Sequence, residues 1–235
     1  MVPPLLDSVY LYTLYNECSR TMLTTPPDRR TRKRLATRQR ISDAATRLFV
    51  ERGFDEVTVD EIAEAADVAR MTVFNHFSRK EDMFFDLDEE GREDLLAALQ
   101  NRDAGTSPIE ALRVFAHRAV AEQRPYLRFF EEGSERFMET IRASEALKAR
   151  ARAIRDELTD MLHLALVQAA DRHQPDAAAK LAASLLVATW EVAFLEAHRI
   201  FQQSRDIERA NTAFLEIVDQ GIRGLKAAVE GSPYA

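Results

Sequence analysis

Residues 57–77, VTVDEIAEAADVARMTVFNHF, constrain the fold of this chain more than any other stretch. Thr58 and Glu61 have the spacing of a capping box, which predicts that a helix begins after Thr58. Apolar residues follow at helical spacing as far as Asp67, a residue type that tolerates the left-handed backbone of a tight turn. A second helix is expected over residues 70–76. The stretch therefore predicts two short helices joined by a tight turn.

The second of these helices is expected to have a packing side and an outer side. The residues available for packing are Val73, Phe74 and Phe77. The residues left for the outer side are Arg70, Met71, Thr72, Asn75 and His76. A short helix of this kind, carried by an alanine-rich helix, has the geometry of a helix-turn-helix recognition element. The alternative is a helical hairpin that belongs to a protein core and never touches DNA.

Three consecutive segments around this stretch resemble the DNA-binding domain of the tetracycline-repressor (TetR) family. They are RISDAATRLFVERGF at 40–54, TVDEIAEAADV at 58–68 and TVFNHFSRKEDM at 72–83. The resemblance covers about 50 of 235 residues, and it is specific because its parts come in the order of the family. It implies an all-α chain with an N-terminal three-helix helix-turn-helix domain and a C-terminal helical domain that binds an effector and dimerises.

The chain departs from the family pattern at four positions of the motif. The family usually has glycine at 67 and 71, serine or threonine at 69, and tyrosine at 74, whereas this chain has Asp67, Met71, Ala69 and Phe74. Phe74 lacks the hydroxyl that a tyrosine would offer to a DNA phosphate. Met71 brings a bulky apolar tip to the outer side of the helix, which should alter the base preference.

The expected DNA contacts follow from the resemblance and from the chemistry of base edges. An arginine such as Arg70 can read guanine, and an asparagine such as Asn75 can read adenine. The resemblance makes Lys80 a phosphate contact in the first turn of a helix that Ser78 is expected to N-cap, with Glu81 three residues on. The full set of expected DNA-contacting residues is Arg32, Lys33, Arg34, Arg38, Thr58, Arg70, Met71, Thr72, Phe74, Asn75, His76 and Lys80.

The distribution of charge supports a local DNA-binding module. Residues 29–80 hold 12 basic and 8 acidic residues, whereas residues 81–235 hold 19 basic and 28 acidic residues. The chain as a whole has a net charge of −7, so it does not look like a general nucleic-acid binder. Seven basic residues lie in the stretch 29–40, RRTRKRLATRQR, which is expected to form an arm that tracks phosphates or enters a minor groove. The alternative is a solvated basic leader without a fixed site.

The remaining sequence predicts an all-α protein of two domains. Seven glycines and eight prolines are few, and no long alternating runs predict strands. Residues 1–28 are expected to be a poorly ordered extension, with a small helix over 5–16 as the alternative. Residues 29–80 are expected to bind DNA, with a first helix from Leu35 to Arg52 that Gly53 ends. Residues 81–235 are expected to form the effector-binding and dimerisation domain, with helical patterns at about 108–123, 125–141, 144–171, 175–203 and 206–229.

The last two helical patterns carry more apolar surface than the core of a single chain needs. This excess is typical of a four-helix dimer interface, and the resemblance also implies a homodimer through these helices. The alternative is that the apolar residues fill the core of a monomer. A homodimer implies a palindromic double-stranded operator, because its two recognition helices are related by symmetry.

Aromatic and methionine residues in the middle helices are expected to line a largely apolar cavity. The candidates are Phe115, Phe129, Phe130, Phe137, Met138, Met161, Leu162, Leu166, Trp190 and Phe194. The residues that could supply polar anchors are His117, Arg118, His163 and Glu191. The alternative is that all of these residues are ordinary core and surface residues. The chemical identity of the effector is not readable from this pattern.

The sequence favours a transcriptional regulator over an enzyme. It contains no G-x-S-x-G, P-loop, H-E-x-x-H or paired-cysteine motif, and its histidines are not spaced as metal ligands. No metal or cofactor is therefore expected. The single cysteine, Cys18, excludes an internal disulfide framework and suits the cytoplasm, and no membrane association is expected. We expect a homodimeric repressor that a small ligand releases from its operator; the alternative is a helical ligand-binding or scaffold protein whose helix-turn-helix no longer binds DNA.

Overall fold

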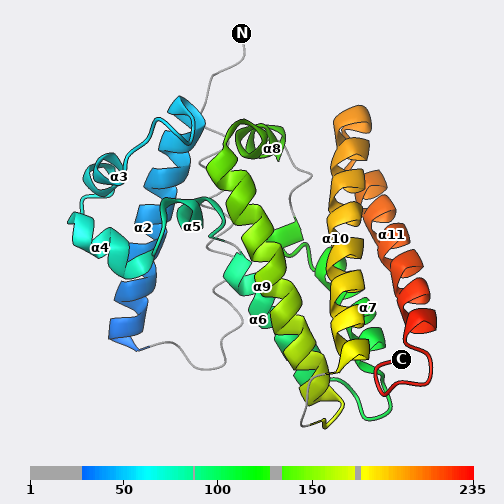
Figure 1. Ribbon diagram of the computed structural model, residues 1–235. Helices are drawn as coiled ribbons and strands as arrows, with labels where there is room; N and C mark the ends of the chain where they lie inside the picture. Colours follow the sequence, from blue (N-terminus) through cyan, green and yellow to red (C-terminus); the bar gives the residue numbers. More distant parts are fainter. Residues whose placement is uncertain (1–27, 87, 128–133, 173–175) are drawn as a thin grey trace. The chain divides into compact units, whose positions relative to one another are not determined.

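The computed structural model describes residues 28–86, 88–127, 134–172 and 176–235, and its regular elements in these ranges are helices (Figure 1). This confirms the all-α prediction. The helices are α2 (Arg29–Arg52), α3 (Val59–Ala65), α4 (Arg70–His76), α5 (Lys80–Phe84), α6 (Asp88–Gln100), α7 (Pro108–Ala121), the 3-10 helix η2 (Pro125–Leu127), α8 (Ser134–Ala143), α9 (Glu145–Ala169), α10 (Ala177–Ser204) and α11 (Ile207–Ala228). The N-terminal extension at 1–27, Phe129 and Phe130 lie outside the described residues.

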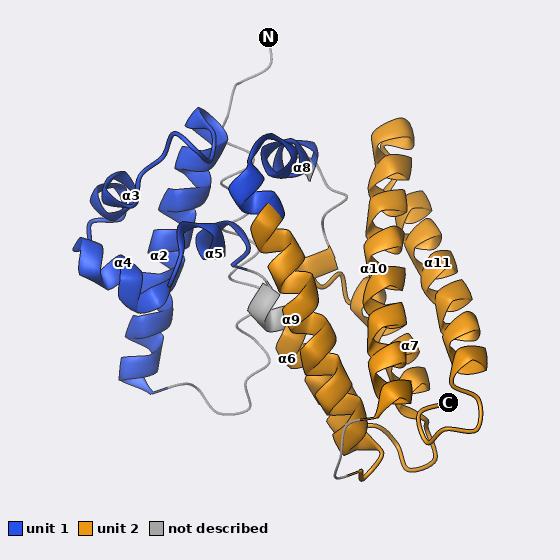
Figure 2. Ribbon diagram, viewed as in Figure 1, with its two compact units in different colours: residues 1–86, 135–148 blue, residues 87–134, 149–235 orange. Residues whose placement is uncertain are grey.

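The chain divides into two compact units (Figure 2). Unit 1 comprises residues 1–86 and 135–148, and unit 2 comprises residues 87–134 and 149–235. Unit 1 therefore extends beyond the residues 29–80 that the sequence suggested, because it also holds most of α8 and the first turn of α9. Helix α9 contributes residues to both units.

The core of unit 1 is formed by the apolar sides of α2, α3 and α4. Its fully buried members include Ile41, Ala45, Ile62 and Val73 of these helices, together with Leu147 of α9. An aromatic group closes this core, with Phe84 at its centre. The rings of Phe84 and Phe137 are stacked with centroids 4.6 Å apart. Phe137 was expected to line a cavity, and this was wrong: it lies on the amphipathic helix α8 and packs within unit 1.

The local signals around the helix-turn-helix are confirmed. The Thr58 side chain accepts a hydrogen bond from the Glu61 amide, and the Glu61 side chain accepts one from the Thr58 amide, which completes the capping box. Asp67 has φ 51° at the turn between α3 and α4. Gly53 ends α2 with φ 88°, a conformation that an L-residue adopts only with strain.

The basic stretch 29–40, which was expected to form a DNA-contacting arm, is helical. Helix α2 begins at Arg29 rather than near Leu35. The Asp28 carboxylate caps this helix by accepting a hydrogen bond from the Thr31 amide at 2.7 Å. The arginine, lysine, leucine, alanine and glutamine residues that follow are good helix formers, so they continue the helix without packing against the core.

The expected N-cap at Ser78 is also wrong. Helix α5 begins at Lys80, its N-cap residue is Arg79, and no side chain caps it. The Ser78 hydroxyl instead donates a hydrogen bond to the Asp82 carboxylate at 3.1 Å. The serine therefore bonds with a side chain in the first turn rather than with the free backbone amides.

Unit 2 has a core in which α10 and α11 form the most extensive pair among the described helices. Gly221 permits this close approach, because a Cβ at that position would collide with the side chain of Thr189. The C-terminal tail closes one end of the unit: Tyr234 is fully buried, and its hydroxyl donates to the Asp176 carboxylate at 2.6 Å. Helix α10 is long and apolar enough to cross a membrane, but its alanine-rich side is buried within this core.

Candidate nucleic-acid interface

Helix α4 presents a compact exposed surface. Met71 is 69% exposed, and Arg70 and Asn75 are exposed beside it. Phe74 is 40% exposed, so the expectation that it is available for packing was wrong. Thr72 and His76 are half-buried, and Val73 and Phe77 anchor the helix in the core. The exposed side therefore combines a guanidinium, a thioether, an aromatic ring and an amide, all of which can contact base edges.

Arg70 is held in place by a residue that the sequence interpretation missed. Its Nη1 atom donates to both carboxylate oxygens of Asp60, at 3.1 and 2.8 Å, and its guanidinium lies 5.6 Å from the centroid of the Phe74 ring. Both partners of the ion pair are more than half exposed, so the pair is weak in water and the guanidinium can leave it for a base. The only sequence signal for Asp60 was an acidic residue in the first turn of α3, where helices commonly have one.

Arg38, which was expected to contact DNA, makes several contacts within unit 1. Its Nη1 atom donates to the His76 carbonyl at 2.8 Å, and its Nη2 atom pairs with Asp86 at 2.6 Å. Its guanidinium also lies 4.2 Å from the centroid of the Phe77 ring. These contacts fix the C-terminal end of α4 to α2. Burial, with the nearby charges of Arg38 and Arg34, lowers the pKa of His76, so its imidazole is neutral near pH 7.

Lys80 is likewise engaged within unit 1. Its ammonium donates to the carbonyls of Phe54 and Val57, at 2.8 and 2.9 Å, and lies 4.2 Å from the centroid of the Phe54 ring. These bonds close the loop between α2 and α3. The geometry gives Lys80 the role of positioning the helix-turn-helix, whereas the resemblance implied a phosphate contact.

We expect Lys80→Ala to destabilise the protein by about 1–3 kcal/mol, because two partly buried carbonyls would lose a charged donor. Chemical denaturation would measure this change. Arg79→Ala is the matched control, because Arg79 is exposed and has no side-chain contact within the described residues. If Lys80→Ala left the stability unchanged but reduced the salt dependence of DNA binding, Lys80 would instead be a contact to a DNA phosphate.

The other expected contacts lie on exposed surface. Arg32, Lys33 and Arg34 are exposed on the first turns of α2. Thr58 is exposed, but its hydroxyl is already bonded to Glu61 in the capping box. The bond from the Thr58 amide is the main cause that lowers the pKa of Glu61 to about 2, so this carboxylate remains charged over the physiological range.

The residues expected to line a cavity are found in several places. Leu162, Trp190 and Phe194 line an apolar groove of about 330 Å³ within unit 2. Phe115 and Leu166 are buried in the core of that unit, and Met161 packs against it. Met138 belongs to unit 1 together with Phe137, so it was wrongly assigned to the cavity.

The expected polar anchors are also dispersed. His117 bonds to Asp219 at 2.9 Å, and Arg118 bonds to Glu122 at 2.6 Å, both away from the groove. Glu191 lines the groove. The Nε2 atom of His163 is buried and has no hydrogen-bond partner within the described part of the chain.

A family model described as "Bacterial regulatory proteins, tetR family" matches residues 41–87, the part of the chain that contains α3 and α4. The chain is 38% identical over 86 residues to the HTH-type transcriptional regulator TcmR of Streptomyces glaucescens, a match that covers 37% of this chain and 38% of TcmR. Over this segment the chain is similar to tetR-family regulators. Another relative is the HTH-type transcriptional repressor Rv1474c of Mycobacterium tuberculosis, which is 38% identical over 68 residues. That match covers 29% of this chain and 36% of the repressor, so the chain spans less than two-fifths of either relative.

Solved structures extend the likeness beyond this segment to the fold of the chain. The complex of SmeT with triclosan covers 80% of this chain and 91% of SmeT, with a TM-score of 0.50 and 22% identity. A putative TetR-family transcriptional regulator from Mesorhizobium loti covers 83% of this chain and 96% of its own, with a TM-score of 0.50 and 19% identity. The relatives are transcriptional regulators and not enzymes, in agreement with the sequence expectation.

Proposed function

We propose that this chain is a cytoplasmic, sequence-specific transcriptional regulator of the tetR family that binds a double-stranded DNA operator through α4. The observation that carries this proposal is the exposed surface of Arg70, Met71 and Asn75 on a helix whose other side is fixed in the core of unit 1. Such a surface meets the requirement for direct reading of bases in the major groove. The kinship with TcmR and with a named repressor supports transcription control and makes repression the default mode.

The test of this proposal is selection of genomic fragments by the purified chain, followed by binding measurements at several salt concentrations. We expect a few fragments to be retained over a large excess of competitor DNA, with an affinity that falls as salt rises. If no fragment were enriched and retention vanished with competitor, the chain would be a helical binding or scaffold protein instead.

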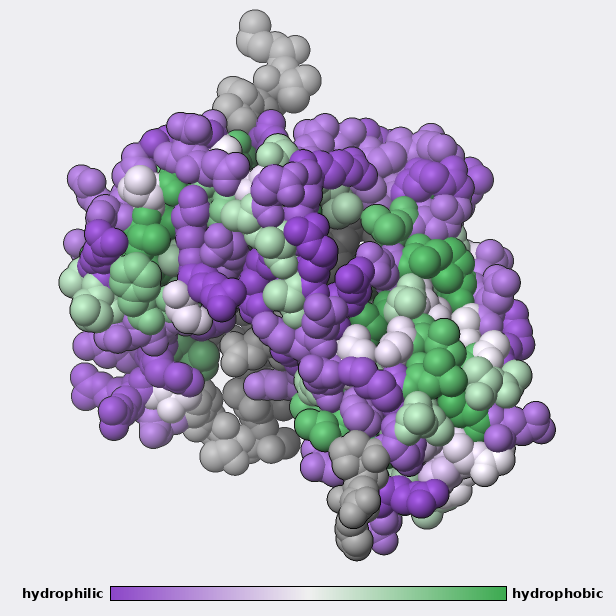
Figure 3. All heavy atoms as spheres, in the orientation of Figure 1, coloured by the Kyte–Doolittle hydropathy of each residue, from purple (hydrophilic) through white to green (hydrophobic). Residues whose placement is uncertain are grey.

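We further propose that the regulator is a homodimer that assembles through α10 and α11. The exposed side of α10 carries an apolar stripe at alternating spacings of four and three residues: Leu181, Leu185, Ala188, Val192 and Leu195. Three of these are largely exposed, at 44% for Leu181, 54% for Val192 and 49% for Leu195. Figure 3 shows hydrophobic surface along α10. This spacing is that of helices that pack side by side in bundles, so a second copy would cover the stripe. A two-fold dimer would require a palindromic operator.

A small, largely apolar ligand is proposed to release the regulator from DNA. Residues of α9 between Ala151 and Leu162 form part of the lining of the groove. Leu147, in the first turn of the same helix, is fully buried in the core of unit 1. A ligand that displaces α9 would therefore also act on the core that holds α4. SmeT, a structural neighbour solved in complex with triclosan, supports a small molecule as the effector.

We expect a groove ligand to raise the melting temperature of the protein and to lower its operator affinity, because ligand and operator favour different states. The measurement is a thermal-shift screen of hydrophobic compounds, followed by operator titration at saturating ligand. A Leu158→Trp variant, which fills the groove, should lose the melting shift and keep DNA binding. If binders left the operator affinity unchanged at saturation, the proposed coupling would be wrong.

A further inference from the structure

The groove of unit 2 has an apolar floor and a charged rim. Its apolar lining comes from α9 and α10, with Leu95 of α6 at one side, and includes Ile154, Leu158 and Trp190. Three lining residues are charged: Arg152, Arg155 and Glu191. A second hollow adjoins it and shares Arg155, Val187 and Glu191, and it is lined mainly by polar and charged side chains. The apolar floor therefore leads directly into a charged surface.

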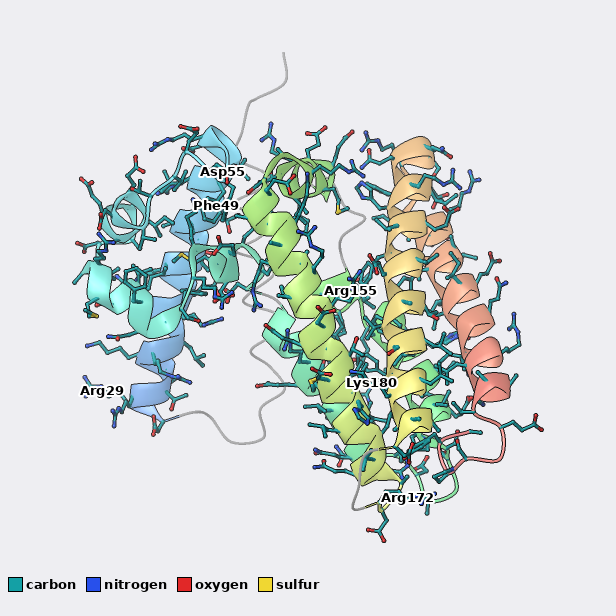
Figure 4. The ribbon with its side chains drawn as sticks, in the orientation of Figure 1. Arg29, Phe49, Asp55, Arg155, Arg172 and Lys180 are labelled. Carbon is teal, nitrogen blue, oxygen red and sulfur yellow. The ribbon has the colours of Figure 1, made fainter. Side chains whose placement is uncertain are left out.

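Most of the charges on this rim are already paired. Arg155 contacts Glu191 at 3.4 Å and Asp156 at 3.9 Å. Lys180 contacts Asp160 at 2.6 Å. Figure 4 shows Arg155 and Lys180 in the region between α9 and α10. The carboxylate that lines the apolar groove is thus neutralised by a cation of the protein, and a positively charged ligand would have to break that pair.

Arg152 differs from the other cations of the rim. It lines the groove, and no carboxylate pairs with it among the residues that the structure describes. Its guanidinium offers five N–H donors in a planar fork that fits a carboxylate with two parallel hydrogen bonds. Among the three charged residues that line the groove, the one without an ion-pair partner in the described part of the chain is therefore a cation, Arg152.

Trp190 is the aromatic residue of the lining whose ring orientation is fixed by its neighbours. Its indole Nε1 atom is buried and has no hydrogen-bond partner among the residues that the structure describes. Its ring stacks on Phe115, with centroids 5.7 Å apart and an interplanar angle of 15°, and this contact fixes the orientation of the ring.

We propose that the groove selects amphipathic organic acids, whose apolar body packs between α9 and α10 and whose carboxylate pairs with Arg152. This inference deepens the proposed regulator function, on which it rests, by naming the chemical class of the effector. Neutral apolar molecules fit the floor but leave Arg152 unpaired. Amphipathic cations also fit the apolar floor, but Arg152 would repel their head group. The Glu191 carboxylate that could attract them is already paired with Arg155.

The experiment compares three molecules with the same apolar chain and different head groups: decanoate, 1-decanol and decylammonium. The readout is the fluorescence of Trp190, which is the single tryptophan of the chain and lines the groove. We expect decanoate to bind the full-length protein at least tenfold more tightly than decylammonium, with 1-decanol between them. The advantage of decanoate should shrink as salt rises, because its head group is held by an exposed charge.

The variant Arg152→Gln tests the assigned residue. It should lower the affinity for decanoate to that for 1-decanol and leave the affinity for 1-decanol unchanged. Arg209→Gln is the matched control, because Arg209 is exposed on α11 and does not line the groove. Equal affinities of the wild-type protein for the three molecules, tighter binding of decylammonium, or an unchanged preference in Arg152→Gln would each overturn the proposal. So would the absence of any fluorescence or melting change with all three. None of these outcomes involves DNA, so the regulator proposal would still stand or fall by fragment selection.

Discussion

Arg70→Ala is expected to change the DNA sequence that the protein selects, and not merely to weaken binding to all sequences. Arg70 is exposed on α4, and Asp60 and Phe74 hold its guanidinium in place before DNA arrives. A paired contact from arginine to guanine contributes about 1–3 kcal/mol of discrimination against the wrong base. Selection from a random DNA pool should therefore lose one conserved guanine in each half-site, with a decrease of roughly tenfold to hundredfold in affinity for the original operator.

Arg79→Ala is the control for this experiment, since Arg79 is exposed but precedes α5 and lies outside α4. It should reduce affinity about equally for all sequences, or not at all. Asp60→Asn should retain the guanine in the selected sequence, because the weak pair with Asp60 must open before Arg70 contacts a base. An unchanged selected sequence in Arg70→Ala would show that Arg70 does not read a base.

Val192→Glu is expected to convert the protein into a monomer and to abolish operator binding. Val192 lies in the middle of the exposed apolar stripe on α10 and is 54% exposed in a single chain. If a second copy covers the stripe, the glutamate would be buried without a partner, which costs several kcal/mol. Sedimentation would report the monomer, and operator affinity should fall by more than about a hundredfold because two half-sites are no longer read together.

Gln168→Glu adds the same charge to an exposed position on α9 and should leave the dimer intact. Unit 2 should remain folded in Val192→Glu, because Val192 is not part of its buried core, and the helical circular dichroism would check this. A Val192→Glu protein that sedimented as a dimer would contradict the proposed interface.

Features encoded by neighbouring residues could be predicted from the sequence. The capping box of Thr58 and Glu61, the turn at Asp67 and the end of α2 at Gly53 each depend on a few adjacent residues. The start of α2 was misplaced because its first turns have no buried side, so the apolar spacing that reveals a helix is absent there. The cap at Asp28 was the available signal.

Features that depend on distant partners could not be predicted in this way. The roles of Arg38 and Lys80 are set by carbonyls 38, 26 and 23 residues away, and a basic residue beside a helix-turn-helix has the same appearance in the sequence whether it contacts a carbonyl or a phosphate. Phe137 was assigned to the wrong core because helical spacing shows that a residue is buried but not against which helices it packs. The groove residues Leu162, Trp190 and Phe194 were found, whereas the unpaired Arg152 could be recognised only once the partners of Arg155 were known.

The most direct measurement of the central claim is a footprint of the protein on the genomic fragment that it selects, combined with the stoichiometry of the complex. The account predicts protection of an inverted repeat whose half-sites are centred about one helical turn, or a small multiple of it, apart. It also predicts protomers bound in multiples of two, and loss of the footprint in Val192→Glu. A selected fragment protected over one asymmetric site by a single protomer, or the absence of any discrete footprint, would contradict the account.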